Sequence, residues 1–250
     1  MTDVLHRLLV GPVRWCNHFI RSFSALTHAF QYKLEGALRP SAEWFDHHLD
    51  AQWQWPRLGR AGFLERGVLS SLALRPQGTV LELCCGDGFN TRHFYAPRAA
   101  RIVAVDANDE ALRHARRFNS ASNISYQSCD ITRDLPKGPF DNVVWDTAIH
   151  HFTRAEALAI LGRVSEVLTR EGGLSGHTVI ESGSTYRYAR QEFADANDLA
   201  ALLGEVFPYV VIRTTIDPGR VNLYFFAGQD RRSLPFDGAR DDTVAVSPAP

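Results

Sequence analysis

The feature of this sequence that most constrains its fold is an apolar run that ends in a glycine-containing turn, at residues 80–90. Gly86 and Gly88 lie in this turn, and glycine lets a backbone pass close to a ligand because it has no Cβ atom. We predict a strand, a tight turn and then a helix that starts near Phe89, whose free amide groups could hold a polar or anionic group. A tight turn without any ligand is the alternative.

Strand-like and helical segments continue to alternate after this turn. Asn108 begins one helix, and Thr153 and Glu156 have capping-box spacing at the start of another, which we expect Gly172–Gly173 to end. This alternation predicts a parallel, doubly wound sheet in an α/β protein. The expected parallel strands are Thr79–Cys85, Arg101–Ala107, Ile124–Asp130, Phe140–Thr147 and Gly173–Glu181.

The last two β-like segments follow a different pattern. Tyr209–Ile216 and Val221–Ala227 are separated only by Asp217–Arg220, which contains Pro218 followed by Gly219. Pro and Gly suit the central positions of a type II turn. We therefore expect an antiparallel hairpin at the end of an otherwise parallel sheet.

Three regions separate by pattern along the chain. Residues 1–78 predict an N-terminal helical extension or cap, because apolar residues from Cys16 to Leu34 recur at three- and four-residue spacing. Residues 79–229 hold the alternating segments of the predicted sheet domain. Residues 230–250 are rich in Asp, Arg, Ser and Pro, and we expect this tail to be disordered.

Composition excludes several classes of protein. The 250 residues carry a formal net charge of -1 and are 45% hydrophobic, which is typical of a globular protein and argues against nucleic-acid binding. Apolar runs are shorter than the roughly 20 residues of a spanning helix, and the N-terminus lacks a secretory pattern. The cysteines (Cys16, Cys84, Cys85 and Cys129) do not have zinc-site spacing. We expect a cytoplasmic protein without a bound metal.

Acidic residues stand at or near the ends of three successive predicted strands. Glu82 lies within the first, Asp106 ends the second about 20 residues after the glycines, and Asp130 ends the third. Each acid alone could be a helix cap or a turn former. Because the carboxyl ends of parallel strands meet at one edge, three such acids together favour a ligand site.

These residues resemble the motifs of a known family, the class I S-adenosylmethionine (SAM)-dependent methyltransferases. The matching motifs are Glu82-x-Cys84-x-Gly86-x-Gly88, Asp106, Asp130 and Phe140–Trp145. The resemblance covers about Thr79 to Ala227 and implies a Rossmann-like methyltransferase fold, with a mostly parallel seven-stranded sheet that ends in an antiparallel hairpin and an N-terminal helical layer. Asn222–Phe226 also looks like bacterial methyltransferases of polysaccharide or secondary-metabolite pathways. Cys84 departs from the family pattern, which most often has glycine there.

The resemblance also implies a SAM site, with S-adenosylhomocysteine (SAH) as the product. By this resemblance, Glu82 and the Cys84–Gly88 backbone hold the methionine part of SAM, and Asp106 binds the ribose hydroxyls. Ala107, Asp130 and Ile131 border the adenine. Asp146 and Thr147 face the methionine part and the methyl group.

The implied activity is methyl transfer to a small-molecule or saccharide acceptor, with a hydroxyl as the expected acceptor group. A methyltransferase-like domain that binds SAM or a partner without transferring methyl is the alternative, although the intact acids favour the enzyme. A nicotinamide-dependent oxidoreductase is a less favoured alternative. The nicotinamide-binding fingerprint has a third glycine three residues after the second, and this sequence has Thr91 at that position. Amine and carbon acceptors, and the oligomeric state, stay open.

His150 and His151 directly follow the fourth strand, where an acceptor would approach the methyl group. A hydroxyl acceptor needs a general base, and histidine titrates near neutral pH. We expect His151, or failing that His150, to be this base; capping of the next helix is the alternative. The histidines lack the carboxylate partners of a metal site.

Two other segments have open interpretations. The aromatic segment Trp44–Trp55 could be a lid over the acceptor or a packed helical layer. The Ser182–Tyr188 segment could line the acceptor pocket or be an ordinary exposed loop. The basic residues Arg7, Arg14, Arg21 and Lys33 of the first segment could form a solvated face or a contact with an anionic membrane surface.

Overall fold

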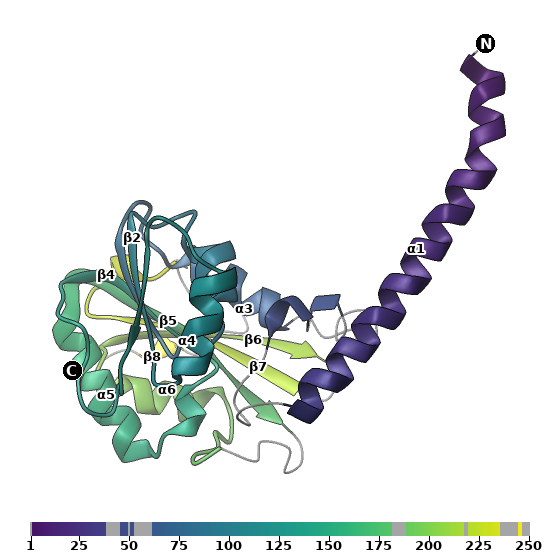
Figure 1. The fold of residues 1–250 in the computed structure, drawn as a ribbon. Helices are drawn as coiled ribbons and strands as arrows, with labels where there is room; N and C mark the ends of the chain where they lie inside the picture. The colour runs from purple at the N-terminus through teal and green to yellow at the C-terminus, as the bar shows by residue number, and fades with distance from the viewer. Residues whose placement is uncertain are drawn as a thin grey trace. The chain divides into compact units, whose positions relative to one another are not determined.

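A computed structural model describes residues 2–38, 46–49, 51–52, 62–181, 189–217, 220–235 and 245–246 (Figure 1). The chain divides into two compact units, residues 1–58 and 59–250. Helix α3 (Gly62–Leu72) therefore belongs with the sheet, although the sequence pattern suggested a boundary after residue 78. Within the first unit, α1 is one helix, Thr2–Leu38, so the helical prediction for this segment is confirmed.

The second unit is built on a mixed sheet with the order β3-β2-β1-β4-β5-β7-β6-β8. The pairs β1–β2, β2–β3, β1–β4 and β4–β5 are parallel, whereas β7 pairs antiparallel with both β5 and β6. The predicted parallel sheet with a terminal hairpin is thus confirmed. The strands are β1 Thr79–Leu83, β2 Arg101–Asp106, β3 Ile124–Ser128, β4 Phe140–Asp146, β5 Leu168–Glu181, β6 Tyr209–Asp217 and β7 Arg220–Gly228. The residues between β6 and β7, where we expected a type II turn, lie outside the described part.

Within the 230–250 tail, the described residues hold short elements. Arg231–Ser233 form a 3-10 turn, η3, and Ala245–Val246 form β8, which pairs antiparallel with β6. The rest of this tail lies outside the described residues.

The helices α3 to α6 of the second unit cover the two faces of the sheet (Figure 1). Because side chains alternate along a strand, Leu81 and Leu83 of β1 face one core, which includes α5 (Arg154–Val167) and α6 (Ala196–Gly204). Val80 and Glu82 face the other side, where α4 (Asp109–Phe118) packs. On that side α3 lies against β6 and β7 through Leu69 and Ala73.

Local capping signals in the sequence set the helix starts. The Asn108 side chain caps α4, and Thr153 and Glu156 form the predicted capping box of α5. The predicted end of α5 is wrong: the helix ends at Val167, before the glycines. Leu168 is already extended and pairs with Phe140, so that β5 begins there.

Candidate functional site

The glycine turn after β1 bends through three left-handed residues. Cys84, Gly86 and Gly88 have φ angles of 55°, 56° and 72°. A side chain at Gly88 would meet Tyr126, whose hydroxyl oxygen would lie 2.4 Å from the added Cβ, so this glycine is needed for packing. Cys84 takes the backbone conformation that glycine adopts easily, which explains how the loop keeps its shape despite the departure from the family pattern.

Glu82 is buried beneath this loop, with 4% of its surface exposed. Its carboxylate accepts a hydrogen bond from the Thr91 hydroxyl at 2.6 Å. Burial raises the pKa of Glu82 well above its usual value, and the nearby carboxylates of Asp146 and Asp87 raise it further. Thr91 lies in η1 (Thr91–Tyr95), a short π-helix that follows the turn. The sequence reasoning considered Thr91 only as a missing glycine and so overlooked it as the partner of this acid.

Asp106, at the end of β2, contacts the glycine turn directly. Its Oδ2 accepts from the Gly86 amide at 2.9 Å, and its Oδ1 accepts from the Asn108 amide at 2.8 Å. The side chain is half-buried. The structure thus brings this predicted ligand-binding acid against the predicted loop.

The predicted adenine-side residues differ in exposure. Asp130 lies just beyond the end of β3. Its Oδ1 accepts hydrogen bonds from the Thr132 amide at 3.0 Å and from the Thr132 hydroxyl at 2.6 Å, and its Oδ2 forms an ion pair with Arg133 at 3.2 Å. These bonds lower the pKa of Asp130. Ile131 is buried in the core, whereas Ala107 is exposed. The Cys129 amide donates to the Asp106 carbonyl at 3.0 Å, which ties this segment to the end of β2.

Asp146 ends β4 within a polar cluster on the side of α3. Its Oδ1 accepts from the Ser70 hydroxyl at 2.8 Å, and its Oδ2 accepts from the Tyr95 hydroxyl. Burial raises the pKa of Asp146, while the Arg66 guanidinium opposes this shift. Asp146 thus stands at the predicted place, held by two hydroxyls that the sequence reasoning did not identify.

A chain of hydrogen bonds begins at Arg66 of α3. Its guanidinium donates to the Thr147 hydroxyl at 2.6 Å, and that hydroxyl lies 2.9 Å from Nδ1 of His177. The other ring nitrogen, Nε2, lies 3.3 Å from Oδ1 of Asn222. A carbonyl oxygen only accepts, so Nε2 carries the proton and Thr147 donates to Nδ1. Burial lowers the pKa of His177 to about 3, and the ring is neutral at physiological pH.

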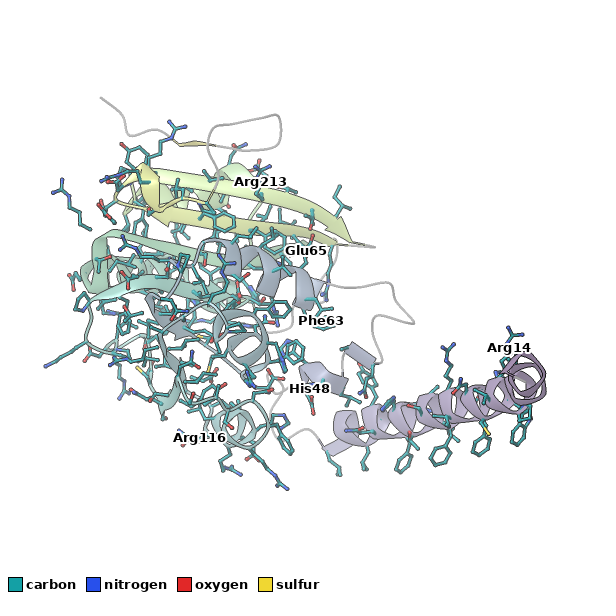
Figure 2. The ribbon with its side chains drawn as sticks, turned by 90° about the horizontal axis from the view of Figure 1, so that it is seen from above. Arg14, His48, Phe63, Glu65, Arg116 and Arg213 are labelled. Atoms are coloured by element: carbon teal, nitrogen blue, oxygen red, sulfur yellow. The ribbon has the colours of Figure 1, made fainter. Side chains whose placement is uncertain are left out.

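The same series of hydrogen bonds continues from Asn222 back to α3. Asn222 donates from Nδ2 to the Thr215 hydroxyl at 3.2 Å, and Thr215 donates to the Glu65 carboxylate at 2.8 Å. Tyr224 donates to the same Glu65 oxygen at 2.7 Å. Figure 2 labels Glu65 beside the outer strands of the sheet. The hydrogen bonds thus run in one direction from a cation to an anion that are neighbours on α3.

The hydrogen bonds of Thr147 explain how a strained backbone conformation is held at the end of β4. Thr147 has a φ of 55°, which is unfavourable for a β-branched residue. The Thr147 amide donates to the His177 carbonyl at 2.7 Å, and its side chain is fixed from both sides. Strained residues that the surrounding structure holds in place concentrate at functional sites. This observation supports the prediction that Thr147 belongs to the site.

His150 and His151 form η2 (Ile149–His151), directly after β4. The two rings lie 4.2 Å apart between centroids, and Nδ1 of His150 lies 3.1 Å from the Thr178 hydroxyl. His150 is buried, and burial lowers its pKa to about 3. His151 is more exposed. The Ser182–Tyr188 loop and the tryptophans of Trp44–Trp55, which we expected near these histidines, lie outside the described residues.

The sequence of this chain is similar to those of known methyltransferases over the part that contains the glycine turn and the strand-end acids. Residues 80–172 match the family model of a methyltransferase domain. The chain is 36% identical over 108 residues to an uncharacterized methyltransferase of Synechocystis sp., which covers 42% of this chain and 49% of that protein. It is 33% identical over 111 residues to an uncharacterized methyltransferase of Mycobacterium tuberculosis, covering 43% and 55% of the two chains. The chain thus spans about half the length of the curated relatives it matches.

Solved structures share the fold. The DhpI–SAH complex aligns with a TM-score of 0.55 and 20% identity, over 74% of this chain and 92% of that one. The N-methyltransferase NodS from Bradyrhizobium japonicum, in complex with SAH, aligns with a TM-score of 0.54 and 20% identity, over 72% and 93% of the two chains. Residues 80–172 thus match a methyltransferase domain, and the sheet that contains them has the fold of two structures that hold SAH.

Proposed function

We propose that this chain transfers a methyl group from SAM to a hydroxyl of a small-molecule or saccharide acceptor. The observation that carries the proposal is the contact of Asp106 with the left-handed turn at Gly86, at the edge where β1, β2 and β4 end. The methyltransferase-domain match over residues 80–172 supports the same chemistry, as do two neighbours of the same fold whose structures contain SAH.

The residues at this edge suit the parts of SAM. Asp106, at the end of β2 beside the glycine turn, would bind the ribose hydroxyls, and the turn from Cys84 to Gly88 with Glu82 beneath it would hold the methionine part. Asp130, Ile131 and Ala107 would border the adenine. Bound SAM would supply an electrophilic methyl group on a cationic sulfur. The buried Glu82 and the half-buried Asp146 give this edge carboxyl groups that suit a cationic ligand.

The acceptor would approach from the end of β4, where Asp146 and Thr147 face α3. Here the protein's task is alignment and removal of the acceptor proton. His150 is a poor base, because a pKa of about 3 leaves its imidazole with little affinity for a proton. His151 stands next to it and is more exposed. We assign the general base to His151, which would accept the hydroxyl proton as the acceptor oxygen attacks.

The first test measures binding of SAH to the full chain by calorimetry, and the second measures SAH formation from SAM with a panel of sugars, phenols and amines. We expect binding, and product with at least one hydroxyl acceptor. Failure to bind either SAM or SAH would refute the proposed function. Binding without product on any acceptor class would instead support the inactive, SAM-binding alternative.

A separate experiment tests the general base, His151, once an acceptor is known. His151→Ala should lower turnover by about 10²–10⁴ with SAH affinity unchanged, because a general base acts on the chemical step. His150→Asn, which removes only the neighbouring imidazole, is the matched control and should retain most of the turnover. If both variants turn over within a fewfold of the parent, His151 is not the base.

A further inference from the structure

Helix α1 carries a continuous apolar face. Large apolar side chains from Val13 to Leu38 are exposed on it, and the fractions reach 70% for Trp15 and 67% for Phe30. At 3.6 residues per turn these side chains fall within an arc of about 160°. They are Val13, Trp15, Phe19, Ile20, Phe23, Leu26, Phe30, Leu34 and Leu38. A face of this size on one helix calls for an apolar partner.

Aromatic rings line the centre of this face. The rings of Trp15 and Phe19 stack with centroids 6.1 Å apart, and those of Phe19 and Phe23 with centroids 6.3 Å apart. In Figure 2 a row of ring-bearing side chains projects from one side of α1, and Arg14 projects from another. Tryptophan and phenylalanine on one face of a helix, with arginine on the other, are typical of helices that lie in a membrane interface.

Acidic residues occur only near the two ends of α1, at Asp3 and Glu35, so the charged residues between them are all basic. From Val10 to Leu34 the sequence contains no Asp or Glu, although acids make up 28 of the 250 residues of the chain. The same stretch holds Arg14, Arg21 and Lys33. Arg14 and Arg21 are seven residues apart, so they project on the same side, opposite the rings. A cationic polar face complements the anionic headgroups of a membrane.

A second copy of the helix fits this face less well. The heptad positions along its centre include Pro12, Cys16 and Lys33, whereas a coiled-coil seam needs regular apolar residues. The positions that flank the seam hold residues such as Ile20 and Ser22 and no opposite charges that would pair between helices. The apolar arc is also wider than a two-helix seam. Among the described helices, none is long and apolar enough to span a membrane, so a spanning mode is not an option for α1.

We propose that α1 binds the surface of an anionic membrane, with its ring-bearing face in the boundary between headgroups and acyl chains and with Arg14 and Arg21 on its polar face. The partner is a lipid surface that carries negative headgroups. This role is independent of methyl transfer, because it depends only on the side chains of α1.

The test is co-sedimentation of the full chain with phosphatidylcholine vesicles that contain or lack phosphatidylglycerol. We expect binding to the anionic vesicles that decreases as salt is added. Phe19→Ala together with Phe23→Ala should reduce the partition coefficient at least about tenfold. Alanine favours helix more than phenylalanine does, so circular dichroism should show α1 intact. Arg14→Gln and Arg21→Gln should each reduce binding to anionic vesicles up to about fivefold at low salt.

Tyr32→Ala is the matched control, because it removes a ring from the polar side of the same helix. It should bind vesicles as the parent does. The proposal is overturned if the full chain stays in the supernatant with both vesicle types, or if Tyr32→Ala weakens binding as much as the Phe19→Ala/Phe23→Ala variant does. Light scattering that shows a dimer, lost in the Phe19→Ala/Phe23→Ala variant and accompanied by no vesicle binding, would assign the face to a second copy of the chain.

Discussion

The amide of Gly86 donates a 2.9 Å hydrogen bond to the carboxylate of Asp106. One residue lies in the turn after β1 and the other ends the neighbouring strand β2. Because this bond crosses between the two strand ends, the acid and the turn are positioned together. A ligand that contacts the turn therefore finds the Asp106 carboxylate at a fixed position beside it.

Replacing Asp106 should weaken binding of SAH. If Asp106 binds the ribose hydroxyls as proposed, Asp106→Ala would remove charge-assisted hydrogen bonds to them, and the expected loss is about 1.5–3 kcal/mol, or roughly ten- to a hundredfold in Kd. Calorimetric titration with SAH measures it. Asp109→Ala, an exposed acid in the first turn of α4, is the control and should bind normally. Equal affinity of parent and Asp106→Ala would remove Asp106 from the site.

The left-handed conformation of Cys84 predicts an unusual order of stability among variants at this position. Cys84→Val should destabilise by about 2 kcal/mol, since a β-branched residue tolerates positive φ poorly. Cys84→Gly should stay within about 1 kcal/mol of the parent, because relief of strain offsets the greater flexibility of the unfolded chain. Urea unfolding gives both values. A Val variant more stable than the Gly variant would show that the backbone strain at Cys84 is not significant.

Removing one donor to Glu65 tests how α3 is fastened. Tyr224→Phe deletes only the hydroxyl that donates to the Glu65 carboxylate at 2.7 Å. We expect a loss of about 1.5–3 kcal/mol in the free energy of unfolding, the range for hydrogen bonds to charged groups. Tyr209→Phe is the control, because its hydroxyl makes no hydrogen bond with the described residues, and it should change stability by less than about 0.5 kcal/mol. Similar losses in the two variants would mean that the Glu65 contact contributes little.

The buried imidazole of His177 predicts a pH dependence of stability. Burial is the main cause that lowers its pKa to about 3, and the positive charge of Arg66 lowers it further. The folded state therefore binds fewer protons than the unfolded state between about pH 3 and 6.5, and stability is lost as pH falls through this window. At pH 5.5 the loss from this group is about 1 kcal/mol relative to neutral pH.

The measurement compares the parent with His177→Gln at pH 7.5 and pH 5.5 by urea unfolding. A comparison is needed because Glu82 and Asp146 have raised pKa values, and their contribution to stability changes with pH in the opposite sense. The parent should lose about 1 kcal/mol more than the variant over this interval. Parallel losses in both proteins would mean that His177 is not the titrating group.

Much of the fold follows from local patterns in the sequence. The alternation of segments, the caps at Asn108 and Thr153 and the short spacing between the last two β-like segments are local signals, so the strands and the hairpin could be predicted from short windows. The acids could be placed as well, because the ends of parallel strands meet at one edge. The end of α5 could not, since it depends on the pairing of Leu168 with Phe140 of another strand.

The part of the site built by α3 was beyond sequence reasoning. Arg66 contacts Thr147 from 81 positions away, and Glu65 contacts Thr215 and Tyr224 from 150 and 159 positions away. No periodicity links residues at such separations, and Glu65–Arg66 reads in the sequence as an ordinary charged pair on a helix. Only the packing of α3 on the outer strands brings these partners together.

The series of hydrogen bonds that starts at Arg66 ends at Glu65, the adjacent residue of α3. Both ends of the series are therefore attached to the same helix, and neither end can open independently of α3. Breaking the link between His177 and Asn222 leaves a buried donor and a buried acceptor unsatisfied, and the other links join half-buried groups, so there is little gain in opening only part of the series. Local opening should therefore involve α3, the end of β4 and the outer hairpin as one unit. In deuterium exchange, their slowest amide protons should share a single opening free energy.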